Sequence, residues 1–145
     1  MKRLAAVLLG IIVFGCGARV KVIDYAPNLD NLNDPIGTIK RTLEQQPIAY
    51  AYVPVKVEVD EQKIVIHLQE YVNPWTFHFH QGVVAYPYYY KNLGQPTLLD
   101  LEPSVWGINI LDKAGNSLYQ AFTLDEQEAK DFINALSYMI KKSER

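Results

Sequence analysis

The sequence predicts an α+β protein in which antiparallel sheets of about seven strands carry a short N-terminal helix and a long C-terminal amphipathic helix. After Pro47, apolar and polar residues alternate in short runs, which is typical of half-buried strands. After Thr123, apolar residues recur every three or four positions, which is typical of a helix. A chain of 145 residues with 49% apolar residues is sufficient for one globular domain.

The short helix is predicted to begin at Asp34-Pro35, which has the pattern of an N-cap followed by proline at the first helical position. Pro47 ends the segment, and Gly37 weakens it. One apolar stripe is formed by Ile36, Ile39 and Leu43.

Seven strands are predicted from period-two runs and the turn residues between them. A tight turn at residues 60–62 joins the first two strands, and a loop containing Gly115 and Asn116 joins the last two. Val20, Val22 and Ile23 could add an edge strand. The seven runs are 53–59, 64–69, 75–80, 84–90, 97–101, 105–111 and 118–122.

The long C-terminal helix has a predicted start and a predicted core face. Thr123 and Glu126 have the spacing of a capping box, and Lys141 and Lys142 lie where the helix dipole favours cations. The core stripe consists of Ala129, Phe132, Ile133, Leu136 and Ile140.

The order of strands followed by one helix, ending in residues 106–110 and 129–136, resembles a pleckstrin-homology-like barrel. In that family the C-terminal helix plugs one open end of two packed sheets, and the resemblance covers residues 51–142. The family's phosphoinositide site needs several basic residues near the first strand pair, whereas Asp60 and Glu61 occupy that turn here. The resemblance therefore concerns the fold, and an α+β roll with helices on one sheet face is the alternative.

The first 16 residues have the layout of a secretory signal peptide. Lys2 and Arg3 precede an apolar run over residues 4–14, which is shorter than the roughly 20 residues that a membrane-spanning helix needs. The sequence at residues 13–16, Val-Phe-Gly-Cys, resembles the bacterial lipobox, and Cys16 is the chain's only cysteine. The resemblance implies cleavage before Cys16, a diacylglycerol on its thiol and a third acyl chain on the new amine.

This resemblance implies the localisation of the protein as well as its membrane anchor. Residues 1–15 would be the signal peptide, 16–33 a tether and 34–145 a single globular domain. The membrane is then a partner through the lipid on Cys16, and Gly17 after the cysteine implies the outer membrane, facing the periplasm. The alternatives are a cleaved signal with an incidental cysteine and an uncleaved N-terminal helix.

The net charge argues against nucleic acid as a partner. Without residues 1–15 the chain has 12 basic and 16 acidic residues, a formal net charge of −4. A mildly acidic protein does not favour nucleic acid, nor does it favour electrostatic adsorption to anionic lipids.

The most suggestive binding feature is a cluster of aromatic residues. Tyrosine combines a rigid apolar ring with a polar tip and is common at recognition surfaces. Consecutive residues of a strand face opposite sides, so some of the cluster must lie outside the core. Sheet-covering tyrosines with no binding role are the simpler interpretation. The candidate binding surface consists of Tyr86, Tyr88, Tyr89, Tyr90 and Trp75.

His78 and His80 are a weak candidate for a metal site. Two histidines two apart on a strand leave the same face and could share a metal ion, but a third ligand is needed. The same alternation places Phe77 and Phe79 in the core and both histidines in water, which requires no metal.

Motifs of catalysis are not found: the sequence contains no Gly-x-Ser-x-Gly, phosphate loop, dinucleotide fingerprint or paired cysteines. We therefore expect a non-catalytic, membrane-anchored envelope lipoprotein that binds another envelope protein, with no cofactor. The alternatives are a carrier of a small apolar or lipid ligand and a metal-dependent activity at His78 and His80.

Overall fold

The structure of the protein is a computed structural model, which describes residues 20–30, 32–47, 54–70, 82–101 and 104–145. Seven strands, two α-helices and one 3-10 turn occur in these ranges. In chain order they are β1 (Val20–Ile23), α1 (Pro35–Glu44), β2 (Lys56–Val59), β3 (Lys63–Glu70), β4 (Gly82–Tyr89), η1 (Tyr90–Asn92), β5 (Thr97–Leu101), β6 (Val105–Leu111), β7 (Ser117–Thr123) and α2 (Glu126–Ser143).

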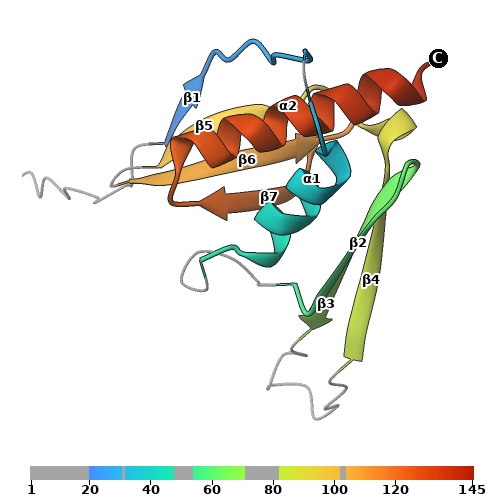
Figure 1. The fold of residues 1–145 in the computed structure, drawn as a ribbon. Helices are drawn as coiled ribbons and strands as arrows, with labels where there is room; N and C mark the ends of the chain where they lie inside the picture. Colours follow the sequence, from blue (N-terminus) through green and yellow to red (C-terminus); the bar gives the residue numbers. More distant parts are fainter. Residues whose placement is uncertain (1–19, 31, 48–53, 71–81, 102–103) are drawn as a thin grey trace, which may run out of the picture.

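The strands form two antiparallel sheets. The four-stranded sheet has the order β1-β5-β6-β7, and the three-stranded sheet has the order β2-β3-β4. Figure 1 shows α2 lying along the four-stranded sheet with α1 beside it. The predicted α+β class, with about seven antiparallel strands, a short helix and a long C-terminal helix, is confirmed. The two sheets are not closed into a barrel, since no ladder joins them among the described strands.

The seven described strands are not the seven predicted runs. The run 75–80 lies outside the described residues, and the seventh described strand is β1, the possible edge strand at Val20–Ile23. This short edge strand pairs with β5, placing Val20 opposite Leu101 and Ile23 opposite Leu98. Part of the segment expected to be a tether is therefore paired with the four-stranded sheet.

Residues 24–30, called the strap here, run from β1 past α2 (Figure 1). The Tyr25 hydroxyl donates a hydrogen bond of 3.0 Å to Asn134 Oδ1, and the Asn28 N–H donates one of 2.8 Å to the same atom. Lys130 Nζ also lies 5.8 Å from the centroid of the Tyr25 ring. One buried side chain of α2 therefore holds the strap at two points.

We expect Asn134→Ala to lower the free energy of unfolding by about 1–3 kcal/mol, because two partly buried donors lose their acceptor. Amide hydrogen exchange should also accelerate across residues 20–30. Ser137→Ala is the matched control, since Ser137 is also buried on α2 but accepts from Gln95 Nε2 at 2.9 Å. Equal exchange of the strap in both variants would contradict this role of Asn134.

The core lies between the helices and the two sheets. Residues from every layer are fully or almost fully buried and belong to one contiguous cluster. The largest of them are Ile39 and Leu43 from α1, Ile64 and Ile66 from β3, Tyr90 from η1, Leu93 after it, Leu98 from β5, Ile108 and Ile110 from β6, and Phe132, Ile133 and Leu136 from α2. The predicted apolar faces of both helices are confirmed.

The start of α1 is capped as predicted, and the cap explains its glycine. Asp34 is the N-cap residue, and its Oδ1 accepts a hydrogen bond of 2.8 Å from the Gly37 N–H. A Cβ atom at Gly37 would lie 2.0 Å from Asp34 Oδ2. The glycine that weakens the helix by its propensity is therefore the residue that makes room for the capping carboxylate.

This coupling predicts that Gly37→Ala has different effects in two backgrounds. In the native chain, alanine stabilises the helix by about 1 kcal/mol through its higher helix propensity. Its Cβ atom also displaces the Asp34 carboxylate, and the loss of that cap costs about 1 kcal/mol, so the two effects cancel. In an Asp34→Ala background no cap remains, so the same change should stabilise the protein by about 1 kcal/mol. Urea unfolding of the four proteins measures the coupling, and identical effects in both backgrounds would contradict it.

The start of α2 differs from the prediction. Asp125, not Thr123, is the N-cap residue, and its Oδ1 accepts hydrogen bonds from the N–H groups of Gln127 and Glu128. Thr123 is the last residue of β7, and its hydroxyl donates to the carboxylate of Glu128. The capping box predicted from the spacing of Thr123 and Glu126 was wrong, because β7 continues through Thr123 and α2 begins only at Glu126.

Candidate functional site

Several predicted site residues lie outside the described part of the chain. These are the lipidation residue Cys16, the aromatic residue Trp75 and the two histidines, His78 and His80. The structure can therefore place four of the predicted site residues, the tyrosines of β4 and η1.

Tyr90 is a core residue and does not belong to an exposed binding surface. Its side chain is 0% exposed, and its hydroxyl donates a hydrogen bond of 3.2 Å to the backbone carbonyl of Asp60. Burial raises the pKa of the Tyr90 phenol far above its ordinary value. The prediction was wrong at this residue because the chain leaves the strand at Tyr89 and turns Tyr90 inward in η1.

Tyr86 and Tyr88 lie on the inner face of the three-stranded sheet. The register places them opposite Ile66 and Ile64, which are fully buried. Tyr88 packs against the core, with its ring centroid 6.4 Å from that of Tyr119, and burial raises the pKa of both phenols. These two half-buried tyrosines cover the core rather than present a surface.

The other face of β4 is exposed and apolar along its whole length. Four exposed residues alternate along the strand with the half-buried Val84, Tyr86 and Tyr88. They are Val83, Ala85, Pro87 and Tyr89. Val83 is 58% exposed and Tyr89 is 39% exposed. We call these four residues the β4 strip, and Tyr89 is its one member from the predicted tyrosine cluster.

Charged residues border the β4 strip on the side of β3 and β2. Lys63 pairs with Tyr89 in the register, and its Nζ lies 5.6 Å from the centroid of the tyrosine ring. On β2, Lys56 forms an ion pair with Glu58, which lowers the pKa of that carboxyl. His67 Nε2 on β3 is 3.3 Å from Glu58 Oε1, without the alignment of a hydrogen bond. The outer face of the three-stranded sheet is therefore an apolar strip beside a charged margin.

The four-stranded sheet has an outer face of a different kind, turned away from the helices. Leu98, Ile108 and Ala121 face inward and belong to the core cluster. The residues that alternate with them along the strands face outward. None of the ten outer-face positions that the register aligns is charged, although 21% of the chain is charged. These positions are Val20, Val22, Thr97, Leu99, Leu101, Val105, Gly107, Asn109, Gln120 and Phe122.

Polar and apolar residues separate along this outer face. Thr97, Asn109 and Gln120 are aligned at one end, whereas Val20, Leu101 and Val105 are aligned at the other. We call the apolar end the apolar corner, and it consists of Val20, Val22, Leu99, Leu101, Val105 and Phe122.

The middle of the apolar corner is buried, with Leu99 6% and Val105 2% exposed, and its edge is open. A Cβ atom at Gly107 would lie 3.0 Å from Leu101 Cδ1 and 3.3 Å from Leu99 Cβ, so these leucines close over the glycine. On edge strand β1, in contrast, Val20 is 57% exposed and Val22 is 64% exposed. The corner therefore presents two valines beside an otherwise packed surface.

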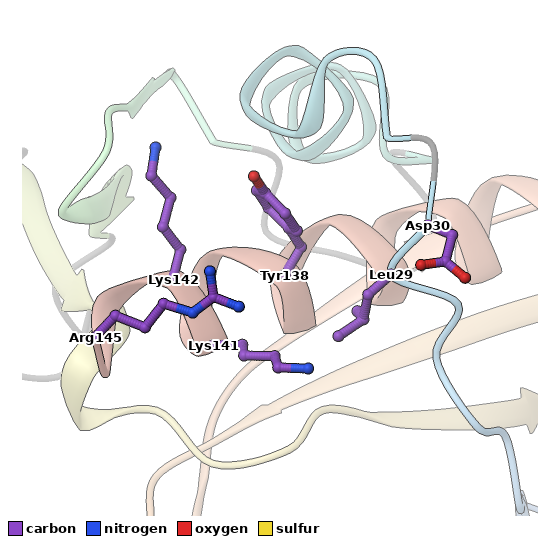
Figure 2. A pocket seen from close by; sticks show the side chains of 6 residues that line it. All are labelled: Leu29, Asp30, Tyr138, Lys141, Lys142 and Arg145. Carbon is purple, nitrogen blue, oxygen red and sulfur yellow. The ribbon is translucent and has the colours of Figure 1, made fainter.

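One cavity of about 300 Å³ lies where the strap passes the end of α2 (Figure 2). Its walls carry three cations and one carboxylate, and Lys142 Nζ is also 3.2 Å from Glu61 Oε1. Cations in the last helical turn stabilise the helix by interacting with its free carbonyl groups. The lining residues are Leu29, Asp30, Tyr138, Lys141, Lys142 and Arg145.

Two further cavities are lined by more polar or charged residues than apolar ones. One, of about 360 Å³, is lined by Glu61, Gln62, Tyr89, Lys91 and Ser143, and the other, of about 210 Å³, lies beside the start of α2. None of these three cavities offers the apolar lining that a carrier of an apolar ligand needs.

Comparison with protein-family models, with curated proteins and with solved structures finds no match for this chain. Within the described ranges, neither helix combines the length and the apolar character that crossing a bilayer requires. The same ranges contain no group of three or more His, Cys, Asp or Glu side chains arranged to hold a metal ion.

Proposed function

We propose that the protein is a non-catalytic envelope lipoprotein, anchored through Cys16 in the outer membrane, whose domain binds another envelope protein at the periplasmic surface. The observation that carries the binding role is the β4 strip, with four successive outward positions that are apolar and exposed. The anchor is supported by the lipobox resemblance at residues 13–16.

The make-up of the three-stranded sheet fits a protein partner. Protein interfaces combine an apolar or aromatic centre with a polar margin. Here Lys63 on β3 lies next to the β4 strip, and the Lys56–Glu58 ion pair lies one strand further away, on β2. Tyr89 is the aromatic anchor of such a surface, because it is exposed on one side and held by Lys63 on the other.

Side chains, rather than the strand edge, carry the proposed recognition. β4 pairs with β3 on one side, and no described strand pairs with its other edge, so a partner could in principle add a strand there. However, Pro87 lies within β4 and lacks a backbone N–H. Proline in an edge strand interrupts the ladder that an added strand would need. The partner therefore contacts the outward face of the sheet.

Photo-crosslinking in intact cells tests this proposal. A photoreactive phenylalanine analogue would replace Tyr89 in one variant and Tyr138 in the other, since the two tyrosines are 39% and 36% exposed. We expect one discrete adduct with an envelope protein from position 89, none from position 138, and loss of the adduct when Val83→Asp is added. The same adducts from both positions, or an adduct that Val83→Asp leaves unchanged, would overturn the role of the β4 strip.

A further inference from the structure

We propose that the apolar corner of the four-stranded sheet rests on the lipid bilayer, so that the anchored domain lies in one fixed orientation. This inference rests on the proposed lipidation of Cys16. It assigns the outer face of this sheet a partner, the interfacial region of the membrane, which is different from the protein partner of the β4 strip.

The distance between the anchor and the sheet supports this docking. Val20, the first residue of β1, follows Cys16 by four residues. An extended chain spans at most about 3.6 Å per residue, so β1 lies within roughly 14 Å of the acylated cysteine. The register then places Val20 beside Leu101 of the apolar corner. The part of the sheet closest to the anchor is thus the part that is most apolar.

The chemistry of the corner suits a lipid surface. Val20 and Val22 leave water when they enter the interface, which is favourable. None of the outer-face positions aligned in the described strands carries a charge that would have to be desolvated with them. The chain without its signal has a net charge of −4, but none of its carboxylates is among the outer-face positions. This face therefore approaches anionic headgroups without direct repulsion.

The strand that follows the proposed anchor is fixed to the rest of the domain. Four residue pairs join β1 to β5, and the strap that follows is fixed to Asn134 of α2. Figure 1 places β1 and the three-stranded sheet on opposite sides of the molecule. When β1 lies at the bilayer, the three-stranded sheet is therefore on the far side of the molecule from β1.

A pair of matched valines tests the orientation. Val22 is 64% exposed and Val83 is 58% exposed, and each lies in an edge strand of its own sheet. Lipid occupies the thiol of Cys16, so the introduced thiol in Val22→Cys or Val83→Cys is the only one available for an environment-sensitive fluorophore. The full-length lipidated protein would be reconstituted in vesicles of phosphatidylethanolamine and phosphatidylglycerol.

We expect the label at position 22 to shift to the blue on vesicles, to be quenched by lipids carrying a nitroxide, and to lose its quenching by aqueous iodide. The label at position 83 should remain accessible to iodide and insensitive to the nitroxide lipids. Equal iodide quenching at both positions, or lipid quenching at position 83 alone, would overturn the proposed docking.

Two further measurements distinguish a failed anchor from a failed docking, and a bilayer from a second copy of the chain. An intact mass without acyl chains would overturn the anchor and the docking together, whereas lipidated protein with an iodide-accessible label at position 22 overturns the docking alone. The second measurement uses a Cys16→Ser background labelled only at position 22, without vesicles. If shielding of that label grows with protein concentration, the corner binds a second copy of the chain, and the bilayer is overturned as its partner.

Discussion

Cys16→Ser is expected to release the protein from the membrane completely. Each buried methylene contributes about 0.8 kcal/mol to membrane attachment, and two or three acyl chains hold a protein durably where one chain does not. The apolar corner offers only two well-exposed valines and cannot replace that anchor. Fractionation of cells into membrane and soluble material measures the release, and intact mass measures the loss of the acyl chains.

Ala18→Ser provides the control for this experiment. It introduces the same residue type two positions away, outside the lipobox, and should leave both the acyl mass and the membrane fraction unchanged. A Cys16→Ser protein that remains in the membrane fraction, or a native protein without acyl mass, would contradict the proposed anchor.

Tyr90→Ala is expected to lower the free energy of unfolding by about 3–5 kcal/mol, which is the usual cost of deleting a buried aromatic side chain. The ring is 0% exposed and belongs to the core cluster, so its removal leaves a cavity between the sheet and the C-terminal helix. Domains of this size are stable by about 5–15 kcal/mol. Urea unfolding should therefore show a large fall in the midpoint.

Tyr89→Ala is the matched control, one residue away in the same tyrosine run. Its exposed ring contacts Lys63 at the surface, so we expect a loss of no more than about 1 kcal/mol. Tyr90→Phe should cost about 1 kcal/mol, because it removes only the hydrogen bond to Asp60. Similar losses from Tyr89→Ala and Tyr90→Ala would contradict the division of these tyrosines between surface and core.

Local signals in the sequence predicted several of the local elements. Asp34-Pro35 was correctly identified as the start of α1, and the apolar stripe from Ala129 to Ile140 as the core face of α2. The pairing of β1 with β5 could not be predicted in the same way, because its partners are more than 70 residues apart. Hydrophobic period identifies a strand and its faces, but not the strand beside it.

The binding surfaces illustrate a second limit. Alternation shows that consecutive tyrosines face opposite sides, but it does not show which side is the core. The predicted surface consisted mainly of the tyrosines of the 86–90 run, whereas the exposed face of β4 consists mostly of Val83, Ala85 and Pro87. A signal for the apolar corner was present in the neighbouring apolar residues Leu98 and Leu99 and again Val105 and Trp106, because adjacent strand residues face opposite sides and both faces are then apolar.

The strap has a consequence for the order of events during biosynthesis. Asn134, which accepts hydrogen bonds from the strap, is made 106 residues after Asn28 and 109 residues after Tyr25. Residues 20–30 therefore have no complete set of native partners until almost the whole chain has been synthesised. In the proposed lipoprotein, the segment that follows the lipidation site can therefore form its hydrogen bonds to α2 only after residue 134 has been made.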